Sequence, residues 1–412
     1  HPSLEGVLDD TYGIMLYEDD AMLVAEAMAG VSREEGDLLR RAISKSESAE
    51  AIAEVSRTFL DRAAASGVSR HIAEQTWVQM AKFNSYSFCK AHAASYAILA
   101  YHLAWLKAHY PLEFMVAVLN HHWGMYPKRV HLEEAKRLGL RVRPPCVNRS
   151  AIEFGIDGGA IRVGLGQVRD LSRRAIESIL AERERRPFRS LGDFLARVRI
   201  SRGEAQNLVL CGAFDFTDRN RPELVLELKT TCVARQGQAD PGRLGLENSP
   251  PAPRTSLNDF SPRQRLAYEL DLLGLSVGEH PMAALRPWLD TRGIVHSTEL
   301  RRRAGETVRA AGVIAASRRT TTRSGDPMRF ITLEDETGIF EVTLFPRVCR
   351  KYNRLVDGYG PYLVEGTVEN QYGALTLNAR RVVRLDTDGA VAGGPRRDRT
   401  PAPAPGDPFL CV

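Results

Sequence analysis

The chain has 412 residues, of which 43% are hydrophobic and 26% are charged, and its mean hydropathy is −0.26. These values predict a globular protein of roughly two to four domains. They exclude a membrane-spanning one, because no apolar run reaches the ~20 residues that cross a bilayer. The charge is uneven: residues 141–202 hold 14 arginines against 7 acidic residues, and residues 301–385 hold 15 basic against 9 acidic residues. The two basic regions predict contact with a polyanion; the alternative is a preference for arginine on solvated faces.

The cysteine pattern argues against disulfides and metal sites. None of the six cysteines forms a CxxC pair, so we expect reduced thiols, a cytoplasmic protein and no metal ligands. The chain starts at His1 without a signal-peptide pattern, which predicts a processed product or a piece of a longer protein.

Helical periodicity runs through the first 135 residues, which we predict to be one helical region. Ser32-Arg-Glu-Glu35 is a capping box, and Gly30 ends the helix before it. Further helices are expected at about 48–65, 71–83, 91–109, 111–120 and 127–138.

The pattern changes after Val142-Arg-Pro-Pro145, which breaks the helix. A hairpin is predicted over 152–163 around an Asp-Gly-Gly turn, and helices follow at about 172–186, 190–198 and 203–211. We therefore expect a second domain over 136–235 and a linker and connector over 236–300, with a short helix near 262–273.

A period of two begins at Thr307 and continues to Leu385. Five short strands, with one helix near 347–356 after the third strand, predict a barrel of the OB type over 301–386. The Gly-, Pro- and Arg-rich residues 387–412 predict a disordered tail. The expected fold class is thus multidomain α+β: a helical region, a helix-hairpin-helix region and a five-stranded β-barrel.

Two clusters in the helical region could bind a nucleotide. Arg41 and Lys45 are four residues apart on one helix face, with Arg40 beside them, and such a set suits a triphosphate. Lys90 and His92 lie where the next long helix begins, and helix N-termini attract anions. The alternatives are a solvated helix face for the first cluster and an ordinary helix start for the second.

The basic regions carry the candidate contacts with nucleic acid. Gly164 and Gly166 form a Gly-x-Gly turn that could present backbone N–H groups to a phosphate, and Arg169 and Arg173 lie beside it. An ordinary tight turn is the alternative.

In the barrel, Arg318, Arg319, Arg323 and Arg329 lie on the first two strands and their connecting loop, where they could line a groove for a single strand. The phenylalanines of the barrel are expected mostly in its core. The sequence contains no Walker A motif, no GxSxG motif and no acidic cluster arranged for two metal ions, so these residues indicate binding without catalysis.

Ten short segments along the chain carry a family resemblance. Four lie in the helical region: Thr11–Tyr17, Gly36–Ala42, Phe88–Tyr96 and Ala104–Pro111. Four lie in the second domain and the connector: Pro144–Asn148, Ile161–Gly166, Gly212–Asp215 and Gly274–Pro281. Two lie in the barrel: Leu333–Gly338 and Val364–Gly366. Together they resemble the bacterial DNA polymerase III alpha subunit (family C), in its fingers, its helix-hairpin-helix region with the connector, and its OB domain.

The resemblance implies part of a DNA-directed DNA polymerase, whose palm with the catalytic carboxylates would precede His1. It implies no catalytic residue or cofactor in this chain, Mg²⁺ for the full-length enzyme, and primed DNA, single-stranded template and deoxynucleoside triphosphates as partners. Arg40, Arg41, Lys45, Lys90 and His92 would serve the incoming nucleotide.

Sliding clamp and accessory polymerase proteins are further partner candidates, although Gln238–Gly242 lacks the apolar pair of a clamp-binding peptide. The choice between the replicative and the error-prone branch stays open. A stand-alone nucleic-acid-binding protein without catalysis is the alternative function.

Overall fold

The structure is a computed structural model that describes residues 1–44, 49–83, 88–122, 124–233 and 256–385. The chain forms two compact units, His1–His109 and Tyr110–Val412. The expected tail at 387–412, Lys45 and the segment Gln238–Gly242 lie outside the described residues.

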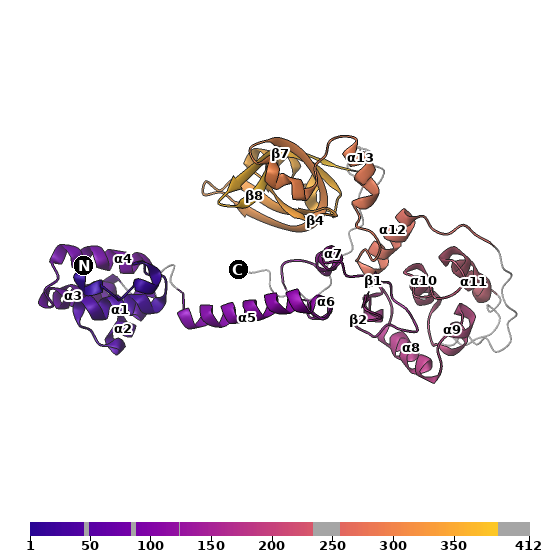
Figure 1. Cartoon of the computed structure of the whole chain (residues 1–412), viewed down its shortest axis with the longest axis horizontal. Coiled ribbons are helices and arrows are strands. Elements are labelled where there is room, and N and C mark those ends of the chain that lie inside the picture. The colour runs from indigo at the N-terminus through magenta and orange to yellow at the C-terminus, as the bar shows by residue number, and fades with distance from the viewer. Residues whose placement is uncertain (45–48, 84–87, 123, 234–255, 386–412) are drawn as a thin grey trace. The chain divides into compact units, whose positions relative to one another are not determined.

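The first unit is helical, as its periodicity predicts (Figure 1). Its helices are α1 (Glu18–Ala29), α2 (Arg33–Ser44), α3 (Ala49–Ala65), α4 (Arg70–Phe83) and α5 (Lys90–His109), with 3-10 turns at Pro2–Leu4 and Asp9–Thr11. Helices α1 to α4 share one core, in which Met28, Phe59 and Met80 are fully buried and Trp77 packs against Phe59 at 5.8 Å. Gly30 ends α1 in the left-handed conformation that a glycine adopts without strain.

Helix α5 has no buried residue among its twenty. Its apolar side chains at helical spacing, Tyr96, Leu99, Leu103 and Leu106, are all between 41% and 61% exposed. The sequence predicted the helix and its apolar positions, but within the unit these positions pack against no core.

The second unit contains a helical body and a barrel (Figure 1). The helices of the body are α6 (Pro111–Asn120), α7 (Lys128–Arg137), α8 (Arg173–Arg185), α9 (Leu191–Arg197), α10 (Arg202–Leu210), α11 (Arg221–Val233) and α12 (Pro262–Leu273). Met115, Leu119 and Leu132 bury into the same core as α8 to α12. The helical region expected to end at 135 therefore divides earlier, at residue 110, because α6 and α7 contribute to the core of the second unit.

Helix α11 is not among the helices that periodicity predicted. Its start nevertheless carries a recognisable signal, since the Asn220 side chain accepts a hydrogen bond from the Glu223 backbone N–H at 3.0 Å. The Glu223 carboxylate in turn accepts from the Asn220 N–H at 3.3 Å, which is a reciprocal cap.

A small sheet of three strands follows α7 in the helical body: β1 (Val142–Arg143), β2 (Gly155–Ile156) and β3 (Ile161–Arg162). Strands β2 and β3 form the expected antiparallel hairpin, with Ile156 opposite Ile161, and β1 pairs parallel to β3. The hairpin brings the carboxylate of Asp157 against the guanidinium of the buried Arg162, at 2.5 Å.

The barrel is closed and five-stranded, in the order β4-β5-β6-β8-β7, as expected. Its elements are β4 (Thr307–Thr321), β5 (Pro327–Glu334), β6 (Ile339–Leu344), α14 (Pro346–Tyr352), β7 (Tyr362–Gln371) and β8 (Ala374–Arg384). The first half of β4 pairs with β7 and the second half with β5, so this long strand bends around the barrel. Helix α13 (Arg286–Asp290) and 3-10 turns at Leu165–Gln167, Ala283–Leu285, Ser297–Arg303 and Leu355–Asp357 complete the unit.

The helical body and the barrel have separate hydrophobic cores and meet through polar contacts of α7. The Arg129 guanidinium donates to the Ile314 carbonyl at 2.8 Å and lies over the Tyr359 ring at 4.9 Å. The Arg137 guanidinium donates to the Glu334 carboxylate at 2.9 Å. This joint therefore depends on charged groups rather than on shared apolar packing.

Candidate nucleotide and nucleic-acid sites

In the first unit, a fixed helix start positions the arginine pair of α2. The Ser32 hydroxyl accepts from the Glu35 N–H, and the Glu35 carboxylate accepts from the Ser32 N–H, which is the predicted capping box. The Arg62 guanidinium grips the same carboxylate with two hydrogen bonds of 2.7 Å. These bonds lower the pKa of Glu35 to about 2, so the carboxylate stays charged and ties α2 to α3.

Arg40 is already engaged by two carboxylates. Its guanidinium donates to Asp37 at 2.8 Å and to Glu18 at 2.8 Å, and only 21% of its side chain is exposed. The hydrogen bond that Arg40 donates to Asp37 raises the pKa of Arg40. Arg41 also pairs with Asp37, at 2.7 Å, but is 56% exposed, so Arg41 is the more accessible of the two cations.

The dipeptide Tyr17-Glu18 connects α2 with the start of α5. Tyr17 forms a β-bridge with Phe88, the Glu18 N–H donates to the Phe88 carbonyl at 3.1 Å, and the two rings meet edge to face at 5.3 Å. The Lys90 ammonium lies 5.3 Å from the centre of the Tyr17 ring. Since Arg40 holds Glu18, the structure places Arg40 and Lys90 against adjacent residues.

The cations of this site face an equal number of carboxylates. Lys90 lies 3.7 Å from Asp10, while Arg40 and Arg41 pair with Glu18 and Asp37. A triphosphate would therefore have to exchange places with these carboxylates, and the accessible Arg41 and Lys90 are the first groups it would meet. His92, the fifth residue predicted here, is exposed and its ring packs against Tyr96 at 4.5 Å.

No three metal-binding side chains converge anywhere in the described parts of the chain. The Mg²⁺ that the resemblance implies for the whole enzyme has no ligand set among these residues, and we assign no step to it.

In the second unit, the Gly-x-Gly turn serves packing. A Cβ atom at Gly164 would lie 2.3 Å from the Ile152 carbonyl oxygen, and one at Gly166 would lie 3.0 Å from the same oxygen. The N–H groups of residues 165, 166, 167, 168 and 169 all donate to backbone carbonyls of the protein. The expectation that this turn presents free N–H groups to a phosphate is therefore wrong, because the neighbouring backbone already accepts them.

The arginines beside this turn are partly committed as well. Arg169 pairs with Asp271 at 2.5 Å, and Arg173 pairs with Glu177 at 3.0 Å, although the Arg173 side chain is 88% exposed. Arg162 is buried in its ion pair with Asp157. Of these three, Arg173 is the one that a phosphate could reach without displacing buried structure.

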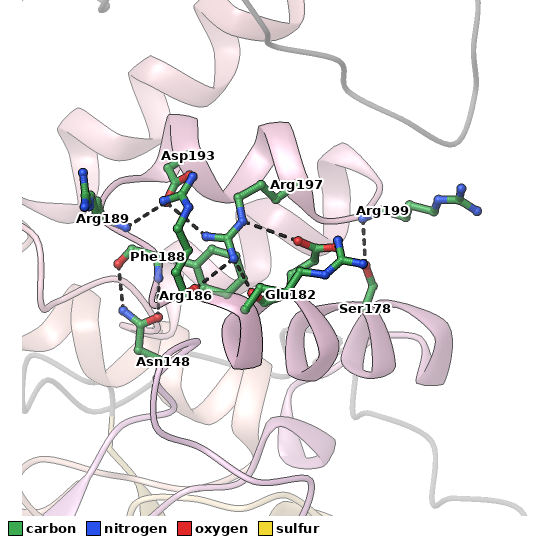
Figure 2. A network of polar contacts seen from close by, with 10 residues as sticks. Asn148, Ser178, Glu182, Arg186, Phe188, Arg189, Asp193, Arg197 and Arg199 are labelled. Atoms are coloured by element: carbon green, nitrogen blue, oxygen red, sulfur yellow. Dashed lines mark hydrogen bonds and ion pairs between the residues drawn. The ribbon is translucent and has the colours of Figure 1, made fainter.

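A polar network between α8 and α9 holds some arginines in place and leaves others accessible (Figure 2). The Arg197 guanidinium stacks over the Phe188 ring at 4.5 Å and bonds to Glu182 and Asp193. Figure 2 shows the side chains of Arg189 and Arg199 extending away from this network. Both are exposed and form no ion pair with any residue that the structure describes.

In the barrel, the structure divides the predicted arginines in the same way. Arg318 and Arg323 are exposed and have no ion-pair partner within the described ranges, whereas Arg319 pairs with Asp357 at 2.6 Å. Arg329 is 5% exposed and donates to Ser317 Oγ, to Asn353, to Asp357 and to the Val356 carbonyl. The expectation that Arg329 lines the groove is therefore wrong, because Arg329 is a core residue that joins β5 to the segment after α14.

The structure adds cations that the sequence reasoning missed. Arg350 of α14 reaches Asp326 in the loop between β4 and β5, which places α14 beside the loop that carries Arg323. Four exposed basic residues belong to α14 and the residues just after it: Arg347, Arg350, Lys351 and Arg354. They add exposed positive charge beside the β4–β5 loop that carries Arg323.

Comparison with known proteins agrees with this division into modules. Residues 1–67 match the family model described as bacterial DNA polymerase III alpha subunit finger domain. Residues 139–224 match the model of the helix-hairpin-helix motif, and residues 308–385 match that of the OB-fold nucleic acid binding domain.

Relatives match nearly the whole chain in one alignment. An error-prone DNA polymerase of Symbiobacterium thermophilum is 33% identical over 94% of this chain and 40% of its own length. The DNA polymerase III subunit alpha of Bacillus subtilis is 32% identical over 89% of the chain and 33% of its own length, and that of Escherichia coli is 32% identical over 94% and 35%. The chain thus spans about a third to two fifths of the length of these relatives.

None of the described helices is both long and apolar enough to cross a membrane. With the finger, helix-hairpin-helix and OB modules in the order of these relatives, the chain belongs to the bacterial DNA polymerase III alpha subunit family.

Proposed function

We propose that this chain supplies the nucleotide- and DNA-binding parts of a DNA-directed DNA polymerase. The observation that carries the proposal is a set of exposed arginines on two nucleic-acid modules that form no ion pair with any described residue: Arg189 and Arg199 on the helical body, and Arg318 and Arg323 on the barrel. Guanidinium groups in such positions neutralise backbone phosphates and release counterions, so they bind DNA without regard to sequence. The family supports DNA as the ligand.

The incoming nucleotide is assigned to the first unit. Arg41 and Lys90 are half-exposed cations that flank the Tyr17-Glu18 dipeptide, and each is paired with a carboxylate that a triphosphate could replace. Arg40 would position this site through Glu18 rather than bind the phosphates directly, because little of its side chain is exposed. The neutral balance of the site predicts weak binding of a free nucleotide to this chain.

The salt dependence of DNA binding tests the DNA part of the proposal. We would titrate a fluorescein-labelled single strand with the 412-residue chain by anisotropy at several salt concentrations, and repeat this with Arg318→Ala plus Arg323→Ala. If both arginines contact phosphates, the slope of the logarithm of the association constant against the logarithm of the salt concentration becomes less steep by roughly 1.4, since each single-strand phosphate contributes about 0.7. Arg57→Ala is the matched control, because Arg57 is an equally exposed arginine in the first unit.

An unchanged slope in the double variant would remove this edge of the barrel from the DNA site. A wild-type chain that binds neither single-stranded nor primed DNA would refute the proposed function as a whole.

A further inference from the structure

The tip of the hairpin between β7 and β8 carries a tyrosine that the fold does not explain. Gln371 pairs with Ala374, so the loop has only two residues, Tyr372 and Gly373. Their φ angles are +52° and +90°, which are those of a type I′ turn. Such loops strongly prefer asparagine before the glycine, because the first position also lies in the left-handed region. A bulky tyrosine there is conformationally unfavourable.

Packing does not compensate for this backbone conformation. The Tyr372 side chain has a relative exposure of 109%, the highest of the large hydrophobic residues that the structure describes. The ring therefore contributes no buried area to the barrel core. When neither backbone preference nor packing accounts for a residue, a strained and exposed side chain points to function.

The chemistry of the tip restricts what the ring could contact. Residues 370–379 contain no charged side chain, and the preceding carboxylate in the sequence, Glu369, is held by the amides of Gln371 and Asn378. The tip thus offers an aromatic face without a cation for a phosphate. Base stacking on an aromatic side chain requires only such a face and tolerates any base.

The register relates this tip to the arginine edge. Strand β7 pairs with the first residues of β4, with Thr307 opposite Thr367, and the loop with Arg323 follows the last residues of β4. The tyrosine and the arginines therefore lie toward opposite ends of one strand, and a nucleic-acid strand that touches both would follow β4 across the barrel.

We propose that Tyr372 is a stacking platform for one base of a single-stranded nucleic acid bound to the barrel. The inference rests on the proposed function, and it adds a contact of a different chemical kind, one that holds a base rather than a phosphate. The unfavourable turn conformation is retained because the ring is needed outside the barrel.

Substitution by the residue that the turn prefers separates stability from binding. The 412-residue chain, Tyr372→Asn and Tyr372→Phe are titrated with a labelled oligothymidylate at several salt concentrations, and their melting temperatures are recorded. We expect Tyr372→Asn to bind roughly 5- to 150-fold more weakly, the factor that the loss of one base–aromatic stack produces. Its salt slope stays that of the wild type, because no charge is removed. Its melting temperature is equal or higher, since asparagine suits the turn.

Tyr372→Phe keeps the ring and is expected to bind within about twofold of the wild type. If the wild type binds and Tyr372→Asn binds equally well, the stacking role is overturned while the proposed function stands. If the wild type binds primed DNA but no single strand, the inference fails while the proposed function stands; if it binds neither, both fail. A Tyr372→Asn chain that loses affinity together with its salt dependence would also overturn the inference, because the effect would then lie in phosphate contacts.

Discussion

Replacing Glu334 with glutamine should remove a pH dependence that is built into the joint between α7 and the barrel. Glu334 is 2% exposed at the end of β5, where it accepts a hydrogen bond from Arg137. Burial outweighs this partner and raises the pKa of Glu334 from 4.5 to about 7. Glu133 lies nearby and adds to the increase, whereas Arg129 and Arg137 oppose it.

The sign and the size of the effect follow from this shift. The folded protein binds the proton more tightly than the unfolded chain, so the stabilisation is fully present below pH ~4.5 and is lost as the pH rises through about 7. A difference of about 2.5 pKa units corresponds to about 3 kcal/mol. Glutamine imitates the protonated acid at every pH. Glu334→Gln should therefore be more stable than the wild type by about 3 kcal/mol at pH 8 and equal to it near pH 4.5.

Scanning calorimetry of both chains between pH 5 and pH 8 measures this difference. The unit has more than one core, so the barrel transition must first be identified. Val342→Ala does this, because Val342 is fully buried in the barrel and its truncation lowers only that transition. Stability profiles of wild type and Glu334→Gln that run parallel from pH 5 to pH 8 would refute the reasoning, since the carboxylate would then be charged or neutral alike in both states.

Two further substitutions test the assignments of glycine and arginine. Gly164→Ala should destabilise the helical body by about 3 kcal/mol in urea unfolding, because its Cβ would overlap the Ile152 carbonyl. Gly155→Ala is the control and should leave the stability nearly unchanged, because no atom lies near its Cβ. A Gly164→Ala variant as stable as the control would contradict the packing role. Arg329→Ala should lower the stability of the barrel by roughly 1–3 kcal/mol, because it leaves buried acceptors such as the Val356 carbonyl without a donor, whereas Asp357 keeps its pair with Arg319. Arg318→Ala should change the stability of the barrel by less than about 0.5 kcal/mol. Similar melting temperatures for Arg318→Ala and Arg329→Ala would refute the division between structural and accessible arginines.

Local sequence patterns were sufficient for most of the elements and their order, with helix α11 as an exception. The helices at 49–65, 70–83 and 262–273 and the five strands of the barrel follow the predicted periodicities within a few residues. The capping box at Ser32 also forms as predicted. These features depend on neighbours within about four residues, and the sequence contains that information directly.

The tertiary structure decided which charged and glycine residues are free to bind. Arg318 and Arg329 look alike in the sequence, yet one is exposed and the other has its hydrogen bonds satisfied inside the barrel. Gly164 fits a phosphate-binding turn by its pattern, but residues 151 and 152 already accept the N–H groups of that turn. Tyr372 lies in a two-residue turn, and its unfavourable backbone conformation and its exposure appear only in the folded hairpin. For Arg329 and for the turn at Gly164 the partners come from other segments of the chain, so periodicity along the sequence could not identify them.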